Sequence, residues 1–250
     1  MSKNMKGFAI VTGGSRGLGA AMVRQLAKEG YDVVINYVSD RSGVIATALA
    51  DEVKKEYGVG AITVQADVSS YQNCKNMVEA GVEAFGEKIA VLINNAGIAS
   101  ARRFDESTPE QYEHLVNVEL LGSMHCTHIV LPYMEKARGG NIIFITSVAG
   151  LNGRGKADYS ACKAGMHGFM RSLVYEVSEF DIRVNCIAPG AIETEIFDAY
   201  TEEQKIRFAA DIPFKRFGKP QDIADAMSYL INANYVTGQI ISPNGGGALY

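Results

Sequence analysis

Short apolar runs rich in β-branched residues alternate with longer segments of helical periodicity along almost the whole chain. The runs predict strands at residues 8–12, 32–37, 61–66, 90–94, 141–147, 183–188 and 239–242. The segments between them predict helices at residues 20–29, 44–57, 71–85, 109–135, 159–179 and 220–231. Strands that are apolar on both faces, each followed by a crossover helix, are typical of a parallel sheet covered on both sides. The alternation therefore predicts a doubly wound α/β fold.

The composition limits the class of protein. The chain has 250 residues, enough for one large α/β domain, and its net charge of -4 favours no binding of nucleic acid. Its first apolar run is too short for a signal peptide or a membrane span, so we expect a cytoplasmic protein. The four cysteines form no Cys-x-x-Cys pair, and His125 and His128 have no third ligand at a suitable spacing. Neither a disulfide framework nor a metal site is indicated.

One segment interrupts the alternation. No linker or repeat divides the chain, so we expect a single domain over residues 1–250, with an insertion at about residues 192–219. The insertion is polar, follows a strand end and carries the aromatic residues Phe197, Tyr200, Phe208, Phe214 and Phe217. Because ligands bind beyond the carboxyl ends of such strands, we interpret it as a substrate lid. An insertion without function is the alternative.

Two motifs carry chemistry. The first predicted strand runs into Thr12-Gly13-Gly14-Ser15-Arg16-Gly17-Leu18-Gly19, directly before a helix. Glycines at this point let the backbone approach a pyrophosphate, which the positive end of the helix stabilises. Tyr159 and Lys163 stand about one turn apart on a predicted helix. A cation beside a phenol lowers the pKa of the phenol, which permits acid-base chemistry near neutral pH.

The glycine spacing, taken with Tyr159 and Lys163, resembles the short-chain dehydrogenase/reductase family from about residue 6 to the C-terminus. The resemblance implies a Rossmann-type sheet of seven parallel strands in the order 3-2-1-4-5-6-7, with helices on both faces. It also implies the catalytic residues Asn117, Ser147, Tyr159 and Lys163. In such enzymes the tyrosine protonates the carbonyl oxygen, the serine donates a second hydrogen bond, and the asparagine holds a water that connects the lysine to solvent.

The same resemblance implies a dinucleotide site. Its expected residues are Gly13, Ser15, Arg16, Gly17, Leu18, Gly19, Asn36, Tyr37, Asp67, Val68, Asn95, Ala96, Gly97, Tyr159, Lys163, Pro189, Gly190, Ile192 and Thr194. The second predicted strand ends Asn36-Tyr37-Val38, without the acidic residue that would bind the ribose diol of NAD. Arg16 is suited to a 2′-phosphate. We therefore expect NADP(H) in preference to NAD(H).

Two other classes of protein are considered. Ser147 suggests an acyl-transfer nucleophile, but no G-x-S-x-G surrounds it and no suitable His follows, so a hydrolase is set aside. A non-catalytic dinucleotide sensor would use the same fold. Such a sensor would tolerate the loss of Tyr159 or Lys163, and the presence of both favours an enzyme.

Within the family, the chain most resembles the 3-oxoacyl-[acyl-carrier-protein] reductases of fatty acid synthesis, which implies a carrier-bound ketone and acyl carrier protein as a partner. The carrier is acidic, so a cationic surface is expected near the mouth of the site, and Arg138 is a candidate. One departure stands against the docking of a carrier protein: Glu176, Glu179 and Asp181 are acidic where similar reductases commonly carry a basic residue. The resemblance also predicts Asp at the position of Asn244, and no consequence follows from this difference. A dehydrogenase of a free alcohol, polyol or hydroxysteroid is the alternative.

The resemblance also implies a homotetramer in which the two longest helices pack against their copies. The apolar residues on these helices are suited to the core or to an interface: Leu115, Val118, Leu121, Met166, Phe169, Met170 and Leu173. The sequence does not divide them between the two.

Overall fold

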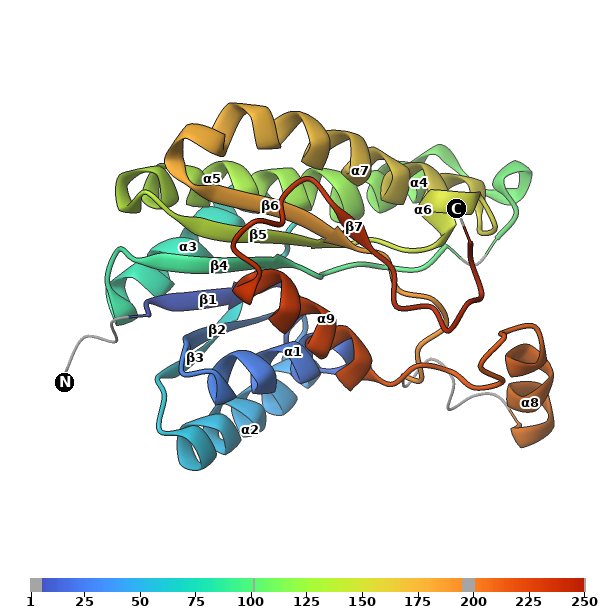
Figure 1. Ribbon diagram of the computed structural model, residues 1–250, viewed down its shortest axis with the longest axis horizontal. Helices are drawn as coiled ribbons and strands as arrows, with labels where there is room; N and C mark the ends of the chain where they lie inside the picture. Colours follow the sequence, from blue (N-terminus) through green and yellow to red (C-terminus); the bar gives the residue numbers. More distant parts are fainter. Residues whose placement is uncertain (1–5, 101, 195–200, 250) are drawn as a thin grey trace.

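Seven parallel strands form one sheet in the order β3-β2-β1-β4-β5-β6-β7 (Figure 1). The computed structural model describes residues 6–100, 102–194 and 201–249. The strands are β1 (Phe8–Val11), β2 (Asp32–Tyr37), β3 (Ala61–Gln65), β4 (Ile89–Asn94), β5 (Gly140–Ile145), β6 (Ile182–Ile187) and β7 (Ile240–Ile241). The predicted fold class and strand order are confirmed.

The chain order reverses at β1. Val11 lies opposite Ile35 of β2 on one side and Ile93 of β4 on the other. Successive strands extend the sheet first through β2 and β3 and then, from β4 onward, in the opposite direction. Loops leave the carboxyl ends of β1 and β4 in opposite directions, which opens a crevice between them where ligands bind in such sheets.

Helices cover both faces of the sheet (Figure 1). On one face lie α1 (Gly17–Lys28), α2 (Asp40–Tyr57) and α9 (Pro220–Asn232), and on the other lie α3 (Tyr71–Phe85), α5 (Gly122–Ala137) and α7 (Ala157–Val177). None of the helices in the described part of the chain combines the length and the apolar character that crossing a bilayer requires.

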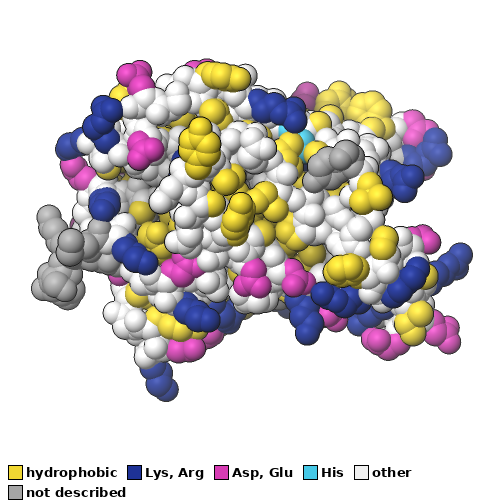
Figure 2. Space-filling model, viewed as in Figure 1, with side chains coloured by type: hydrophobic (Ala, Val, Ile, Leu, Met, Phe, Trp, Pro, Cys, Tyr) yellow, Lys and Arg dark blue, Asp and Glu magenta, His cyan; other side chains and the backbone are white. Residues whose placement is uncertain are grey.

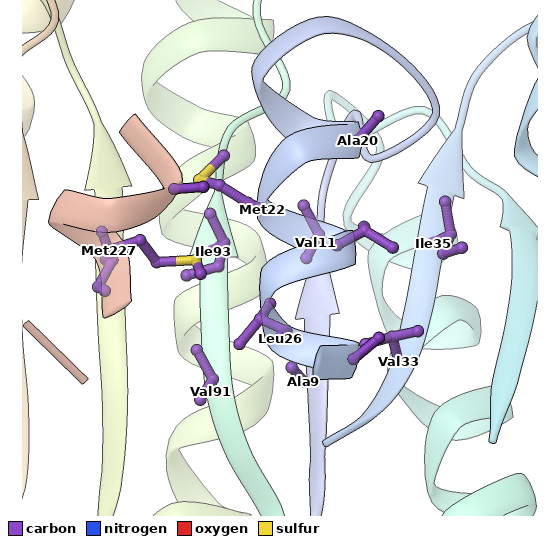
Figure 3. Close-up of a cluster of buried hydrophobic side chains, with 14 of the residues drawn as sticks. Ala9, Val11, Ala20, Met22, Leu26, Val33, Ile35, Val91, Ile93 and Met227 are labelled. Carbon is purple, nitrogen blue, oxygen red and sulfur yellow. The ribbon is translucent and has the colours of Figure 1, made fainter. Parts of the chain in front are cut away.

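Each face has its own apolar core. Figure 3 shows Met22 and Leu26 of α1 and Met227 of α9 lying over the strand residues Val11 and Ile93. The opposite core is built around Phe8 and Phe144, against side chains of α3, α5 and α7. Strand residues contribute alternately to the two cores, which explains why the strand runs are apolar throughout.

The helix predicted over residues 109–135 is interrupted. It consists of α4 (Pro109–Val116), a π-helical segment η2 (Asn117–Leu121) and α5. In η2 the N–H of Gly122 donates to Asn117 O, an i→i+5 bond that widens the turn. The prediction of one regular helix is therefore wrong at its centre, and the widened turn alters which side chains face inward.

Four short elements escaped prediction: η1 (Phe104–Glu106), α6 (Ala149–Asn152), η3 (Ser178–Phe180) and α8 (Glu202–Ala210). α8 lies within the insertion, whose two ends are joined because Glu193 N donates to Gly218 O at 2.8 Å and Gly218 N to Ala191 O at 3.0 Å. The two ends of the insertion therefore lie side by side. Phe197 and Tyr200 lie outside the described residues.

Candidate functional site

A cavity of about 1120 Å³ opens at the carboxyl ends of the strands. The loops that follow β1 through β6 all contribute to its walls. Every residue that the sequence assigned to the dinucleotide lines this cavity, and so does Ser147. Asn117 does not line it and is exposed. The glycine loop and the Tyr159–Lys163 pair therefore share one continuous space.

The glycine loop has a backbone that side chains would obstruct. Gly13 and Gly17 have φ values of 60° and 54°, in the left-handed region. A Cβ on Gly19 would lie 2.2 Å from Gly13 O, so no larger residue fits there without moving the loop. α1 begins at Gly17, and its amino-terminal turn, with Gly17, Leu18 and Gly19, lines the cavity. A cradle of this shape suits an anionic group such as a pyrophosphate.

Asparagine and threonine side chains hold the loop in place. Asn36 accepts from Gly13 N at 3.0 Å and donates to Ala66 O at 2.9 Å. Asn95 donates to Thr12 O at 2.9 Å, while Thr12 Oγ1 accepts from Asn95 N at 2.9 Å and from Ala96 N at 3.0 Å. The amide of Asn36 is thus engaged with backbone, and its role is to shape the loop. The role of Thr12 was missed, although it stands directly before the glycines.

The end of β2 forms the basic end of the cavity. Arg16 and Arg41, both exposed, line it together with Ser39 and Ser42. Ser39 caps α2 by accepting from Ser42 N at 3.3 Å. Asp40 accepts from Gln65 Nε2 at 3.3 Å and is not among the lining residues. Arg41 was not assigned from the sequence, although it follows the strand end that lacks an acidic residue.

The opposite end of the cavity holds Ser147, Tyr159 and Lys163. Ser147 follows β5, and its Oγ accepts from Ala149 N at 3.1 Å where α6 begins. Tyr159 lies half-buried in the first turn of α7, and Lys163 lies one turn further on. The Nζ atom of Lys163 is 5.5 Å from the centroid of the Tyr159 ring. The structure thus brings three of the four predicted catalytic residues to one cavity wall.

Glu119 is the nearest charged partner of Lys163. Its Oε2 lies 2.7 Å from Lys163 Nζ, and the two side chains are 1% and 6% exposed. Lys163 Nζ also donates to Ile145 O at 2.9 Å. Burial lowers the pKa of Lys163, but the carboxylate of Glu119 and the phenol of Tyr159 outweigh it, so the pKa of Lys163 is raised. The ammonium is therefore held charged inside the protein.

The structure places Asn117 apart from the other residues predicted to be catalytic. Asn117 is exposed on η2, whereas Glu119, two residues later, is buried and lines the cavity. The position beside Lys163 is therefore filled by a carboxylate. The signal available in the sequence was a lone acidic residue between the apolar Val118 and Leu120.

The loop after β6 closes the cavity wall through Pro189, Gly190, Ile192 and Thr194. A Cβ on Gly190 would lie 2.7 Å from Asn244 Cα, so the loop packs tightly on the C-terminal segment. Asn244 Nδ2 donates to Ser242 Oγ at 2.9 Å and to Ala248 O at 3.0 Å. An aspartate could not make these donations, which accounts for the amide at this position.

Arg138 was expected near the mouth of the site, and in this subunit it does not lie there. Arg138 ends α5, directly before β5 begins at Gly140, whereas Ile145 at the other end of β5 lines the cavity. A strand of this length spans about 20 Å. The guanidinium instead donates to Glu179 O at 2.8 Å. Arg138 therefore lies at the end of the sheet opposite to the cavity mouth.

Comparisons with known proteins agree with this geometry. A family model described as short chain dehydrogenase matches residues 7–205. The 3-oxoacyl-[acyl-carrier-protein] reductase FabG of Staphylococcus epidermidis is 37% identical over 245 residues, which cover 97% of this chain and 99% of the reductase. The reductase of the same name from Aquifex aeolicus is 36% identical over 241 residues, 95% of this chain and 96% of its own.

A solved structure is similar over its whole length. It is the crystal structure of a blue fluorescent protein from a metagenomic library in complex with NADPH. It is 32% identical to this chain, covers 100% of both chains and superposes with a TM-score of 0.89.

Proposed function

The chain belongs to the short-chain dehydrogenase family and is an oxidoreductase acting on CH–OH groups, and from this premise we propose that it reduces a 3-oxoacyl group on acyl carrier protein with NADPH. The observation that carries the proposal is the single cavity that joins the glycine cradle to Tyr159 and Lys163. Bound NADPH would supply the hydride. The protein's own residues bind the cofactor, orient the ketone and deliver the proton.

The dinucleotide would lie along the cavity. The loop from Gly13 to Gly19 would hold the pyrophosphate, Asp67 and Val68 would flank the adenine, and Lys163 would hold the nicotinamide ribose. The loop from Pro189 to Thr194 contacts the nicotinamide. The ammonium of Lys163 has three N–H donors. It donates to Ile145 O and forms an ion pair with Glu119 Oε2 at 2.7 Å. A further N–H would bind a hydroxyl of the ribose.

Preference for NADPH follows from charge. Arg16 and Arg41 are two cations at the end of the cavity bounded by β2, and a guanidinium matches the geometry of a phosphate. The carboxylate of Asp40 lies outside the lining. The similar crystal structure is a complex with NADPH, which supports the same cofactor here.

Tyr159 supplies the proton. Hydride transfer to a ketone builds negative charge on the carbonyl oxygen. We infer that Tyr159 Oη donates its proton to this oxygen, while Ser147 Oγ donates a second hydrogen bond. Ser147 is free to do so because its bond with Ala149 N uses the oxygen as an acceptor. The Lys163 ammonium stabilises the phenolate that remains.

The substrate assignment follows the curated relatives, which are named for 3-oxoacyl-[acyl-carrier-protein]. Basic residues that suit an acidic carrier lie within α8 and after it, among acidic residues (Figure 2): Lys205, Arg207, Lys215 and Arg216. Lys205 is paired with Glu202, and Arg216 with Asp222. We propose that residues 192–219, which include these basic residues, form a lid over the substrate. The acidic end of α7, with Glu176 and Glu179, favours the second candidate, a free alcohol or ketone of small size.

We also propose a cytoplasmic homotetramer. Five of the apolar residues on the long helices are buried within the chain itself: Leu115, Val118, Met166, Met170 and Leu173. Leu121 is 37% exposed and Tyr175 is 85% exposed, and both are available for contact with a second copy. Light scattering tests this proposal, because a mass equal to the 27.0 kDa chain would contradict it.

Steady-state oxidation of NADPH tests the function. We expect acetoacetyl-acyl carrier protein to be reduced with a higher kcat/KM than the same acyl group on a free thiol, a steroid ketone or a small diketone. Equal rates for carrier-bound and free thioesters would favour the second candidate. Binding of NADPH without turnover of any ketone would indicate a sensor.

A further inference from the structure

The buried carboxylate of Glu119 adds a negative charge to the cavity wall that holds Tyr159 and Lys163. Glu119 Oε2 lies 2.7 Å from Lys163 Nζ. The same Nζ atom lies over the ring of Tyr159, 5.5 Å from the ring centroid. We propose that Glu119 is a positioning residue that fixes the Lys163 ammonium and sets the pH at which Tyr159 gives up its proton. The proposal deepens the proposed function and rests on Tyr159 as the proton donor.

The protein builds a dedicated seat for this carboxylate. Oε1 of Glu119 accepts from Ile98 N at 2.8 Å, while Oε2 faces Lys163. A Cβ on Gly97 would lie 2.7 Å from Oε1, so the chain leaves room for the carboxylate only by having glycine there. The π-helical turn of η2 carries Glu119 inward and leaves Asn117 outside. Both oxygens of the Glu119 carboxylate are therefore held in place, one by the backbone of Ile98 and the other by Lys163.

Charge counting gives the direction of the effect. A carboxylate at Glu119, an ammonium at Lys163 and a neutral phenol at Tyr159 together carry no net charge. Loss of the phenol proton then leaves a net negative charge in a site of low dielectric constant, which is unfavourable. With a neutral residue at position 119, the same loss would convert a net positive charge to zero. Glu119 therefore makes Tyr159 retain its proton to higher pH.

Other titratable groups near this pair do not replace Glu119. Burial, followed by the charge of Glu119, raises the pKa of Cys162 to about 11, so the thiol stays protonated. Burial also lowers the pKa of His167, which keeps that imidazole neutral. Asp158 accepts from Ser100 Oγ at 2.9 Å. Other charged or titratable groups on the surrounding elements include His114 and Glu113 of α4, His125 of α5, Arg102 after β4, Arg154 and Lys156 before α7, and Arg171 of α7.

A set of three variants tests the proposal. Glu119→Gln keeps the length of the side chain and one acceptor oxygen but removes the charge, and Glu119→Asp keeps the charge. The control is Glu113→Gln, which removes one charge from an exposed position on α4. In the pH dependence of kcat/KM for alcohol oxidation with NADP⁺, we expect Glu119→Gln to shift the rising limb to lower pH by about one unit. In Glu119→Asp and Glu113→Gln, the rising limb of kcat/KM should lie at the same pH as in the parent.

A second measurement needs no substrate. The parent and Glu119→Gln are titrated with base, and the ultraviolet absorbance of tyrosinate is recorded. The same titration of each protein with the added substitution Tyr159→Phe is subtracted, which leaves the signal of Tyr159. The Tyr159 signal should appear at lower pH in the neutral variant. Glu119→Asn gives the same comparison if Glu119→Gln does not fold, as judged by circular dichroism.

An unshifted Tyr159 titration in a folded neutral variant would overturn the role of Glu119. This result is distinct from failure of the proposed function, because a protein that reduces no ketone can still show the shift.

Discussion

Gly97 and Glu119 are in such close contact that a Cβ on the glycine would lie 2.7 Å from Oε1 of the carboxylate. Glu119 cannot move away at low cost because Ile98 and Lys163 hold its two oxygens. We expect Gly97→Ala to lower the free energy of unfolding by about 1–3 kcal/mol, the usual cost of overpacking. Urea unfolding measures this loss. In the double variant Gly97→Ala/Glu119→Asp, the shorter carboxylate should recover part of the lost free energy of unfolding. Strictly additive effects of the two substitutions would contradict a contact between residues 97 and 119.

Asn117 provides a test of the candidate site. Because its side chain is exposed and does not line the cavity, we expect Asn117→Ala to remove no interaction with the transition state and to keep kcat within about twofold of the parent. Steady-state kinetics with the best ketone measure this. A loss of a hundredfold or more would show that the sequence prediction was right and that Glu119 does not occupy the functional position.

The basic end of the cavity determines the choice of cofactor. We expect Arg16→Ala and Arg41→Ala each to raise the Kd for NADPH by about tenfold and to change that for NADH little, because only NADPH carries the 2′-phosphate. Quenching or enhancement of NAD(P)H fluorescence reports both affinities. Lys28→Ala, at the far end of α1, is the matched control. Equal losses for the two cofactors would count against a phosphate contact.

His167 gives a dependence of stability on pH. Its imidazole is buried, with Nε2 2.9 Å from Thr146 Oγ1. Burial first, and then the positive charges of Arg171 and Lys163, lower its pKa in the folded state. The unfolded chain therefore binds this proton more readily, so the contribution of His167 is complete above about pH 6.5 and is lost as the pH falls below that value. Tm should fall with acidification less steeply in His167→Gln than in the parent, and parallel curves would contradict this.

Much of the fold could be predicted because periodicity reports burial. Residues 71–85 were predicted as a helix with the bounds that α3 has, and the predicted strand ends differ from the observed ones by at most two residues. The π-helical turn at Asn117–Leu121 could not be predicted, because its sequence has no feature that distinguishes it from regular helix. The choice between Asn117 and Glu119 depends on that turn. Residue type alone favoured the asparagine.

Arg138 shows a different kind of error. A residue directly before a parallel strand lies at the amino end of the sheet, while ligands bind at the carboxyl end. The predicted strand at residues 141–147 therefore already placed Arg138 far from the site. Arg41 is the opposite case, because it follows a strand end and its position at the cavity could have been inferred from the sequence.

The most direct measurement compares turnover and cofactor affinity in Tyr159→Phe. The variant keeps the ring beside Lys163 and removes only the hydroxyl, which matters when charge develops on the substrate oxygen. We predict that kcat falls by at least about a thousandfold while the Kd for NADPH stays within about threefold of the parent. Turnover at the parental rate in a folded Tyr159→Phe variant would contradict the assignment of Tyr159 as the proton donor.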